Sequence, residues 1–371
     1  MSDRLATLPD LLTTLTGNRI QTREAWEQTR RLEILTLLNE QMYGIRPVER
    51  PDKLSFHVLS SEPALDGLAM RKQIRIEYSG TGGTGAIRLL LFVPAAGPKP
   101  APAFLLAAIK GQQVLDAPDP TAYEEFWPVR QIVKRGYAAA AYQVEDLDPD
   151  DRTLPYLDGV HGVFGPFESP KPANAWGSMS AWAWGASRIL DYLETDPDVD
   201  DQRVAIIGHS RGGKAALWAG ASDSRFAMVI SNNSGCSGAA ISRGKAGEQL
   251  RNINNGNPHW FNDLYKQYND RENELPFDQH MLLALVAPRL LYVTSATEDG
   301  WADPESEFLG IRLAEPAWRL YGFKGLGTSD FPAPDSPIHG DRLGYHLRTG
   351  KHDLTATDWQ WVLDFADSRF R

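Results

Sequence analysis

Residues Val204–Trp218 read Val-Ala-Ile-Ile-Gly-His-Ser-Arg-Gly-Gly-Lys-Ala-Ala-Leu-Trp, and they predict a buried strand, a tight turn and a helix. The four leading apolar residues are typical of a strand that is covered on both faces. The turn Gly208-His-Ser-Arg-Gly212 has the spacing Gly-x-Ser-x-Gly, whose glycines permit a bend that lifts the serine hydroxyl above the sheet. The helix that follows directs free N–H groups and partial positive charge at the bend. The stretch therefore predicts Ser210 as a catalytic nucleophile.

Two other interpretations of this turn carry less weight. A glycine-rich turn can serve only to pack a helix against a strand, without any chemistry. A dinucleotide-binding turn would need the spacing Gly-x-Gly-x-x-Gly, which is absent at residues 208–213. The strand–turn–helix setting favours the nucleophile over both alternatives.

A serine hydroxyl is a weak nucleophile and needs a histidine to take its proton. In enzymes with this turn the histidine comes last in the chain, near the final helix. His352 lies in Gly350-Lys-His-Asp-Leu354, directly before a predicted closing helix at 357–368, and it is the candidate base. His346 is the alternative.

The acid that orients this histidine is expected at the carboxyl end of a late strand, between the serine and the histidine in the chain. Asp299 follows an apolar strand that ends near Thr294, and it is the candidate acid. Two alternatives stay open: Asp299 and Gly300 could form an ordinary turn, and Glu298 is a close rival for the role.

From residue 103 onward the sequence alternates between strand-like and helix-like segments. The predicted strands are apolar runs at 103–109, 137–142, 203–207, 227–231 and 289–295, and the predicted helices lie at 126–135, 175–193, 211–220 and 357–368. Before them we expect a helix at 23–41 and an antiparallel pair of strands at 72–78 and 86–93. This alternation predicts an α/β fold, a three-layer αβα sandwich with a mostly parallel central sheet.

No convincing linker interrupts the pattern, so residues 1–371 are expected to form a single domain. About 1–95 would be an N-terminal extension of helix and β-hairpin, and loops would be inserted at about 145–172 and 235–280. The acidic run Glu145–Asp151 is expected to be a solvated loop, which could edge the mouth of the site.

Composition excludes several classes of function. The formal charge of −10 argues against binding to nucleic acid or to an anionic membrane surface. The single cysteine, Cys236, excludes an internal disulfide and a cysteine-based zinc cluster, and there is no His-Glu-x-x-His motif. We therefore expect no metal. No stretch reads as a signal peptide or membrane span, which predicts a cytoplasmic location, and the oligomeric state is left open.

Three motifs together carry a resemblance: Gly-His-Ser-Arg-Gly-Gly-Lys at 208–214, Glu-Asp-Gly-Trp-Ala-Asp-Pro at 298–304 and Gly-Lys-His-Asp-Leu at 350–354. They resemble the glucuronoyl esterases, carbohydrate esterase family 15, and most closely its bacterial branch. The likeness covers most of the chain, including Asn257-Pro-His-Trp-Phe261. It implies an α/β-hydrolase fold and a serine esterase without metal or cofactor. Its substrates would be esters that join 4-O-methyl-glucuronic acid on xylan to lignin alcohols.

The resemblance also implies roles for individual residues. Ser210 would be the nucleophile, His352 the base, and the Arg211 guanidinium would help to stabilise the oxyanion. The residues that would bind the uronic acid are Lys214, Glu248, Trp301, His259 and Trp260. Because cations at a helix N-terminus oppose the helix dipole, Arg211 and Lys214 are expected to face a ligand instead.

One position departs from the fungal pattern. Fungal members carry the triad acid after the strand that follows the nucleophile helix, and that position here is Asn233. An amide cannot stabilise an imidazolium by charge, so the acid role is expected at Asp299. A cytoplasmic enzyme would act on an imported oligosaccharide ester or a small uronate ester. The alternative functions are an acetyl-ester or other small carboxylesterase and an inactive sugar-binding protein on the same scaffold.

Overall fold

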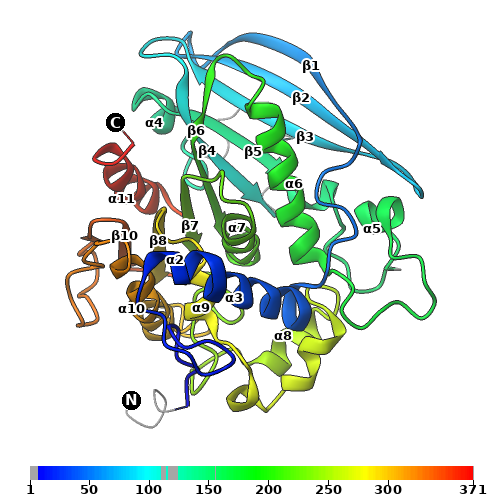
Figure 1. Ribbon diagram of the computed structural model, residues 1–371. Helices are drawn as coiled ribbons and strands as arrows, with labels where there is room; N and C mark the ends of the chain where they lie inside the picture. Colours follow the sequence, from blue (N-terminus) through cyan, green and yellow to red (C-terminus); the bar gives the residue numbers. More distant parts are fainter. Residues whose placement is uncertain (1–6, 110–113, 116–123, 155, 371) are drawn as a thin grey trace.

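The protein is described by a computed structural model that covers residues 7–109, 114–115, 124–154 and 156–370 (Figure 1). These residues form a ten-stranded sheet in the order β1-β2-β3-β5-β4-β6-β7-β8-β10-β9. The strands are β1 (Lys53–Ala64), β2 (Ala69–Gly80), β3 (Gly83–Pro94), β4 (Ala101–Ala108), β5 (Ala138–Gln143), β6 (Val199–His209), β7 (Met228–Asn232), β8 (Leu290–Ala296), β9 (Ile338–His339) and β10 (Leu343–Arg348).

The middle of the sheet is parallel. Strands β5, β4, β6, β7, β8 and β10 pair in parallel register, whereas β1, β2 and β3 join antiparallel at one end and β9 at the other. Central strands are covered on both faces, since alternate side chains enter two different cores. In β4, for example, Leu105 packs into one core, and Phe104 and Leu106 pack into the other.

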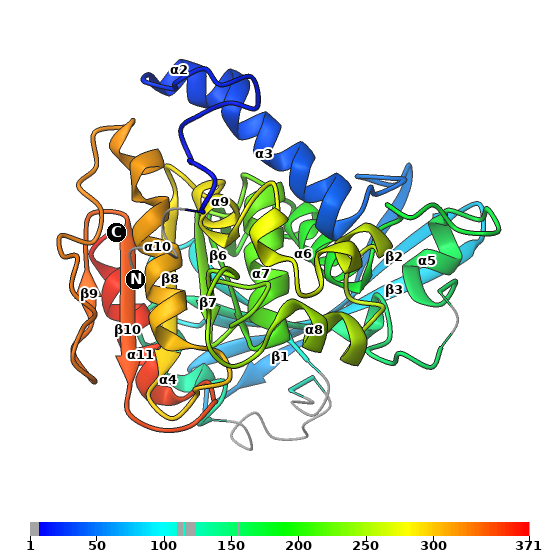
Figure 2. The same ribbon diagram turned by 90° about the horizontal axis from the view of Figure 1, so that it is seen from below.

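Helices cover both faces of this sheet (Figure 2). The larger core receives side chains of α3, α6, α7, α9 and α10, and the smaller one those of α4 and α11. The α-helices are α2 (Arg23–Ala25), α3 (Arg31–Leu38), α4 (Val129–Lys134), α5 (Gly159–Phe164), α6 (Ser178–Leu193), α7 (Arg211–Ser222), α8 (Leu250–Gly256), α9 (Gln279–Ala284), α10 (Pro304–Arg319) and α11 (Ala356–Asp367). The predicted three-layer sandwich with a mostly parallel sheet is therefore confirmed. None of the described helices is both long and apolar enough to cross a lipid bilayer.

The helix predicted at 23–41 is a continuous helical segment with two π-helical turns. It consists of α2, η1 (Trp26–Arg30), α3 and η2 (Asn39–Tyr43), while short 3-10 turns elsewhere are η4 (Val144–Asp146), η5 (Asp263–Tyr268) and η6 (Glu272–Glu274). The segment ends at Gly44, whose φ is 87°. A Cβ at Gly44 would lie 2.3 Å from the Trp176 Cα atom, so only glycine fits where this segment meets the chain before α6.

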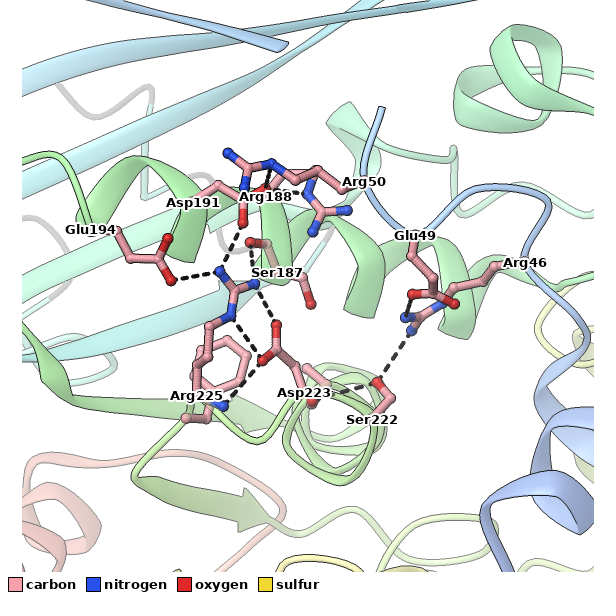
Figure 3. Close-up of polar contacts among 12 residues, drawn as sticks. Arg46, Glu49, Arg50, Ser187, Arg188, Asp191, Glu194, Ser222, Asp223 and Arg225 are labelled. Atoms are coloured by element: carbon pink, nitrogen blue, oxygen red, sulfur yellow. Dashed lines mark hydrogen bonds and ion pairs between the residues drawn. The ribbon is translucent and has the colours of Figure 1, made fainter. Parts of the chain in front are cut away.

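The far end of α7 is held by a network of charged side chains (Figure 3). Arg225 pairs with Asp223, which follows the helix, and with Asp191 of α6, whose side chain is almost fully buried. Arg46 donates to the Ser222 hydroxyl at 3.4 Å. These contacts fix α7 against α6 at the end opposite the nucleophile turn.

Candidate active site

The nucleophile turn has the strained geometry that its sequence predicts. Ser210 lies between β6 and α7 with φ 56° and ψ −123°. A non-glycine residue in such a conformation costs about 1–3 kcal/mol and persists only where its surroundings hold it. A Cβ on Gly208 would lie 2.1 Å from the Gly212 carbonyl oxygen, and one on Gly212 would lie 2.7 Å from the Ala107 carbonyl oxygen. Both glycines are therefore required by close backbone approach.

Four parallel strands end at the same edge of the sheet as this turn. His209 of β6 lies opposite Asn232 of β7, and Thr294 of β8 lies opposite both Asn232 and His346 of β10. The carboxyl ends of parallel strands are where ligands bind in open α/β sheets. The segments that leave β6, β7, β8 and β10 carry Ser210, Asn233, Asp299 and His352.

An imidazole–carboxylate pair lines the same cavity as Ser210. The His352 Nδ1 atom is 2.6 Å from Asp299 Oδ2, and the Asp299 side chain is buried while His352 remains partly exposed. Burial raises the pKa of Asp299, but hydrogen bonds from His352 and from the Ala302 N–H outweigh it and hold the pKa below its ordinary value. The carboxylate therefore stays ionised. With Nδ1–H donated to it, His352 Nε2 is left to accept a proton.

Glu298 and His346, the alternative candidates for the acid and the base, lie away from the cavity lining. Glu298 is exposed, and its backbone N–H donates to the Gly350 carbonyl oxygen. His346 is completely buried within β10, where its Nε2 lies 2.8 Å from Asp358 Oδ1. Neither residue lines the cavity that contains Ser210.

A second histidine packs beneath the candidate base. The rings of His209 and His352 lie 4.4 Å apart, and His209 Nδ1 is 2.5 Å from Asn232 Oδ1. Burial, with a smaller effect of His352, lowers the pKa of His209 to about 4. His209 is therefore neutral near pH 7, so it packs under His352 without adding a positive charge.

An open cavity of about 400 Å³ joins these side chains. Among the described residues its lining consists of Ser210, Arg211, Lys214, Asn233, Ser234, Gly235, Glu248, Asn257, Trp260, Asp299, Trp301, Ala302 and His352. The side-chain amide of Asn233 is buried and makes no hydrogen bond within the part of the chain that the structure describes. The volume is in the range of small-molecule sites.

Arg211 pairs with Asp150, a carboxylate that the sequence did not single out. Its Nη1 donates to Asp150 Oδ2, and its Cζ lies 5.4 Å from the centroid of the Trp260 ring. Asp150 belongs to the acidic run Glu145–Asp151, and its side chain is 3% exposed. The prediction of a solvated acidic loop is thus wrong for Asp150, because donors from three distant positions neutralise and bury its carboxylate.

The predicted sugar-binding residues mostly gather around the cavity. Lys214 is buried and donates from Nζ to the Ser234 carbonyl oxygen at 2.5 Å. Glu248 is half-buried, and Trp301 presents a 57% exposed side chain at the cavity. Trp260 forms part of the wall between Arg211 and Lys214.

His259 is the exception among these residues. Its Nε2 lies 3.1 Å from Asp150 Oδ1, and it lines a separate cavity of about 30 Å³ rather than the large one. The structure therefore places His259 behind the site, against the carboxylate that holds Arg211.

A buried carboxylate under the cavity was missed in the sequence. Glu307 of α10 is fully buried and accepts hydrogen bonds from the Gly235 N–H at 2.8 Å and the Ser295 hydroxyl at 2.7 Å. Burial, aided by the charge of Asp299, raises the pKa of Glu307 to about 7 against these hydrogen bonds. Through these two hydrogen bonds, Glu307 links the Gly235 turn at the cavity to Ser295 of β8.

Glu307 predicts a pH dependence of stability. The unfolded chain binds this proton below about pH 4.5, and the folded protein binds it up to about pH 7. Its stabilising effect is therefore complete below pH 4.5 and is lost as the pH rises to 7. In urea unfolding, we expect the free energy of unfolding of wild type to fall relative to that of Glu307→Gln by about 2–3 kcal/mol as the pH rises from about 5 to about 8. Parallel pH curves for the two proteins would contradict this.

Comparisons with known proteins agree with one another. A family model described as glucuronyl esterase, fungi, matches residues 163–322. The chain is 39% identical to carbohydrate esterase MZ0003 from an unknown prokaryotic organism, over 97% of this chain and 89% of that protein. It is 29% identical to the 4-O-methyl-glucuronoyl methylesterase of Schizophyllum commune, over 85% of this chain and 74% of that protein.

A solved structure is similar along the whole chain. The glucuronoyl esterase from Solibacter usitatus is 42% identical over 98% of both chains, with a TM-score of 0.90. Identity and coverage at this level establish the family, and the resemblance seen in the sequence is confirmed. The chain belongs to the glucuronoyl esterases, carbohydrate esterase family 15.

Proposed function

We propose that this protein hydrolyses esters of glucuronic acid through an acyl-enzyme on Ser210. The observation that carries the proposal is a cavity that contains a serine on a strained turn, a His352–Asp299 pair and the two cations Arg211 and Lys214. Its family membership supports ester hydrolysis, and its relative in Schizophyllum commune is named for methyl esters of 4-O-methyl-glucuronic acid.

In the first half-reaction, Ser210 Oγ attacks the ester carbonyl carbon while His352 Nε2 takes the hydroxyl proton. The carbonyl oxygen becomes an oxyanion, which the N–H groups at the start of α7 and the Arg211 guanidinium stabilise. Collapse of the intermediate expels the alcohol, which receives the proton from His352. Asp299 stabilises the imidazolium that forms between these steps.

In the second half-reaction, a water molecule attacks the acyl carbon, and His352 takes a proton from that water molecule. The bond to Ser210 Oγ breaks, the serine recovers its proton, and the uronate leaves as a carboxylate. Water and ester are thus converted to alcohol, uronate and a proton, with no other reactant.

The cavity wall supports a sugar acid as the acyl group. Lys214 and Glu248 offer a donor and an acceptor for hydroxyl groups, and Trp301 and Trp260 offer flat apolar faces of the kind that stack on sugar rings. An acetyl group has no hydroxyls and needs none of these partners. The polar, aromatic lining therefore favours a uronate ester over an acetyl ester.

The proposal is tested by comparing kcat/KM for methyl glucuronate and for 4-nitrophenyl acetate. We expect the uronate ester to be preferred, because only it can use the hydroxyl and stacking contacts of the wall. Equal or better cleavage of the acetate would make this a small-acyl carboxylesterase. Failure of Ser210 to react with a fluorophosphonate would instead indicate an inactive sugar-binding protein.

Trp301→Ala is expected to raise KM for methyl glucuronate about tenfold, the loss of one stacking contact worth ~1.4 kcal/mol. The kcat value should change much less, because the Trp301 ring offers an apolar face for binding and no acid, base or nucleophile for the reaction. Steady-state kinetics check both constants. Phe331→Ala is the matched control, since Phe331 is an exposed aromatic that lies outside the cavity lining. A tenfold fall in kcat with unchanged KM in Trp301→Ala would contradict a binding role.

A further inference from the structure

The environment of Arg211 is that of a compensated cation. Asp150 Oδ2 accepts from the guanidinium, while Asp150 Oδ1 accepts from the Trp260 Nε1–H at 2.8 Å and from His259 Nε2 at 3.1 Å. Among the described residues, the pair with Asp150 is the one hydrogen bond that the guanidinium makes. The Arg211 side chain is nevertheless 35% exposed, and it lines the cavity that contains Ser210.

The carboxylate is held more rigidly than the cation it binds. The Asp150 side chain is 3% exposed, and two of its hydrogen-bond partners are the adjacent residues His259 and Trp260. Burial raises the pKa of Asp150, but bonds from His259, Trp260 and Arg211 outweigh that effect and hold the pKa well below its ordinary value. A fixed anion therefore lies behind the guanidinium.

The Asp150 carboxylate changes the balance of charge around the cavity. The charged lining residues are Arg211, Lys214, Glu248 and Asp299, two cations and two carboxylates. Adding Asp150 gives three carboxylates against two cations, with His352 neutral before it takes a proton. The substrate ester is neutral, the oxyanion is transient, and the released uronate carries a lasting negative charge at neutral pH.

We propose that Asp150 is a positioning residue that fixes the Arg211 guanidinium as half of a neutral pair, so that it can donate to the transient oxyanion without retaining the carboxylate product. The inference rests on the proposed uronate esterase function. An isolated, partly buried guanidinium binds a carboxylate strongly through two parallel N–H···O bonds. Asp150 already occupies one of its nitrogens and cancels its charge, so the free uronate dissociates and turnover continues.

The test is product inhibition of methyl glucuronate hydrolysis by added sodium glucuronate in wild type and Asp150→Asn. The amide is isosteric and can still accept from Trp260 and His259, but it removes the charge that compensates Arg211. We expect the inhibition constant of glucuronate to fall about tenfold in Asp150→Asn, and kcat to fall because the guanidinium is less well fixed. A merely structural role of Asp150 would weaken the binding of ester and acid alike, and it would not tighten the acid.

Asp151→Asn is the matched control in the same loop. Asp151 Oδ1 accepts from the Thr153 N–H and hydroxyl, and Asp151 is not among the described residues that line the large cavity. We expect its glucuronate inhibition constant to match that of wild type. An inhibition constant in Asp150→Asn that is unchanged or higher would overturn the inference. Absence of methyl glucuronate hydrolysis in wild type would instead mean that the proposed function itself fails.

If Asp150→Asn does not fold, product inhibition of the wild-type enzyme by glucuronate still tests the inference. A compensated cation predicts that glucuronate binds no more tightly than the neutral methyl ester. It also predicts that raising NaCl from about 20 to about 500 mM does not weaken the inhibition, because the site has no net positive charge to screen. Tight, strongly salt-dependent inhibition by glucuronate would show an uncompensated cation and would overturn the inference.

Discussion

Ser210→Ala is expected to abolish hydrolysis of methyl glucuronate, with a loss in kcat on the order of 10⁵. The loss is this large because, among the described residues that line the cavity, no second hydroxyl or thiol is free to replace Ser210. Ser234 also lines the cavity, but its hydroxyl is engaged with Ser231 at 2.7 Å and accepts from the Ala239 N–H at 2.8 Å. Cys236 is fully buried, and burial raises the pKa of its thiol to about 12. Release of methanol under saturating substrate measures the loss.

The control for this prediction lies on the same helix. Ser222 is at the far end of α7, where its hydroxyl donates to the Trp218 carbonyl oxygen at 2.7 Å. Ser222→Ala should keep nearly all activity and should still react with a fluorophosphonate, whereas Ser210→Ala should do neither. Substantial turnover by folded Ser210→Ala would mean that the ester is cleaved without an acyl-serine, and the mechanism proposed above would be wrong.

Strands with two buried faces are predicted from the sequence by their apolar composition alone. The central strands β4, β6, β7 and β8 read as continuous apolar runs, and each prediction overlaps the observed strand. β1 was missed because an edge strand with one exposed face mixes polar and apolar residues.

β10 was missed for a different reason. It is buried along its whole length although it contains His346 and Arg348. Both side chains bond Asp358 of α11, and a polar composition therefore conceals a buried strand. Helix α10 was missed as well, and with it Glu307, because Pro316 lies within its last turn and prolines ordinarily signal a break.

The site divides in the same way. Ser210, His352 and Asp299 could be predicted because the order of these residues along the chain and their places at strand ends are set by the geometry of the turn. Asp150 could not be predicted as a site residue, because none of its hydrogen-bond partners Arg211, His259 and Trp260 lies near it in the sequence. These partners come from 61 to 110 residues away, so its burial depends on tertiary contacts alone. One feature of the sequence did point to this pair: a cation at a helix N-terminus needs a counter-charge, and the acidic run Glu145–Asp151 could supply it.

Asp299→Asn is expected to lower kcat about 10³- to 10⁴-fold while leaving the fold intact. An amide cannot stabilise the imidazolium, and it can also present an N–H that favours the wrong tautomer of His352. The effect should be strong because the His352 side chain is 43% exposed, so little besides Asp299 fixes its ring. Glu298→Gln, a charge removal at the adjacent exposed residue, should stay within about twofold of wild type. The reverse ranking would transfer the acid role to Glu298.

The chain offers a sharper control, because it contains another imidazole–carboxylate pair that is fully buried. His346 and Asp358 are both fully buried, and Asp358 also pairs with Arg348 and caps α11. Asp358→Asn should therefore lower the melting temperature while kcat per folded molecule stays near that of wild type, the opposite of Asp299→Asn. What separates the two pairs is access to solvent: a buried imidazole cannot meet a substrate, whereas His352 opens on the cavity. A loss of kcat in folded Asp358→Asn as large as that in Asp299→Asn would contradict the assignment of His352 as the base.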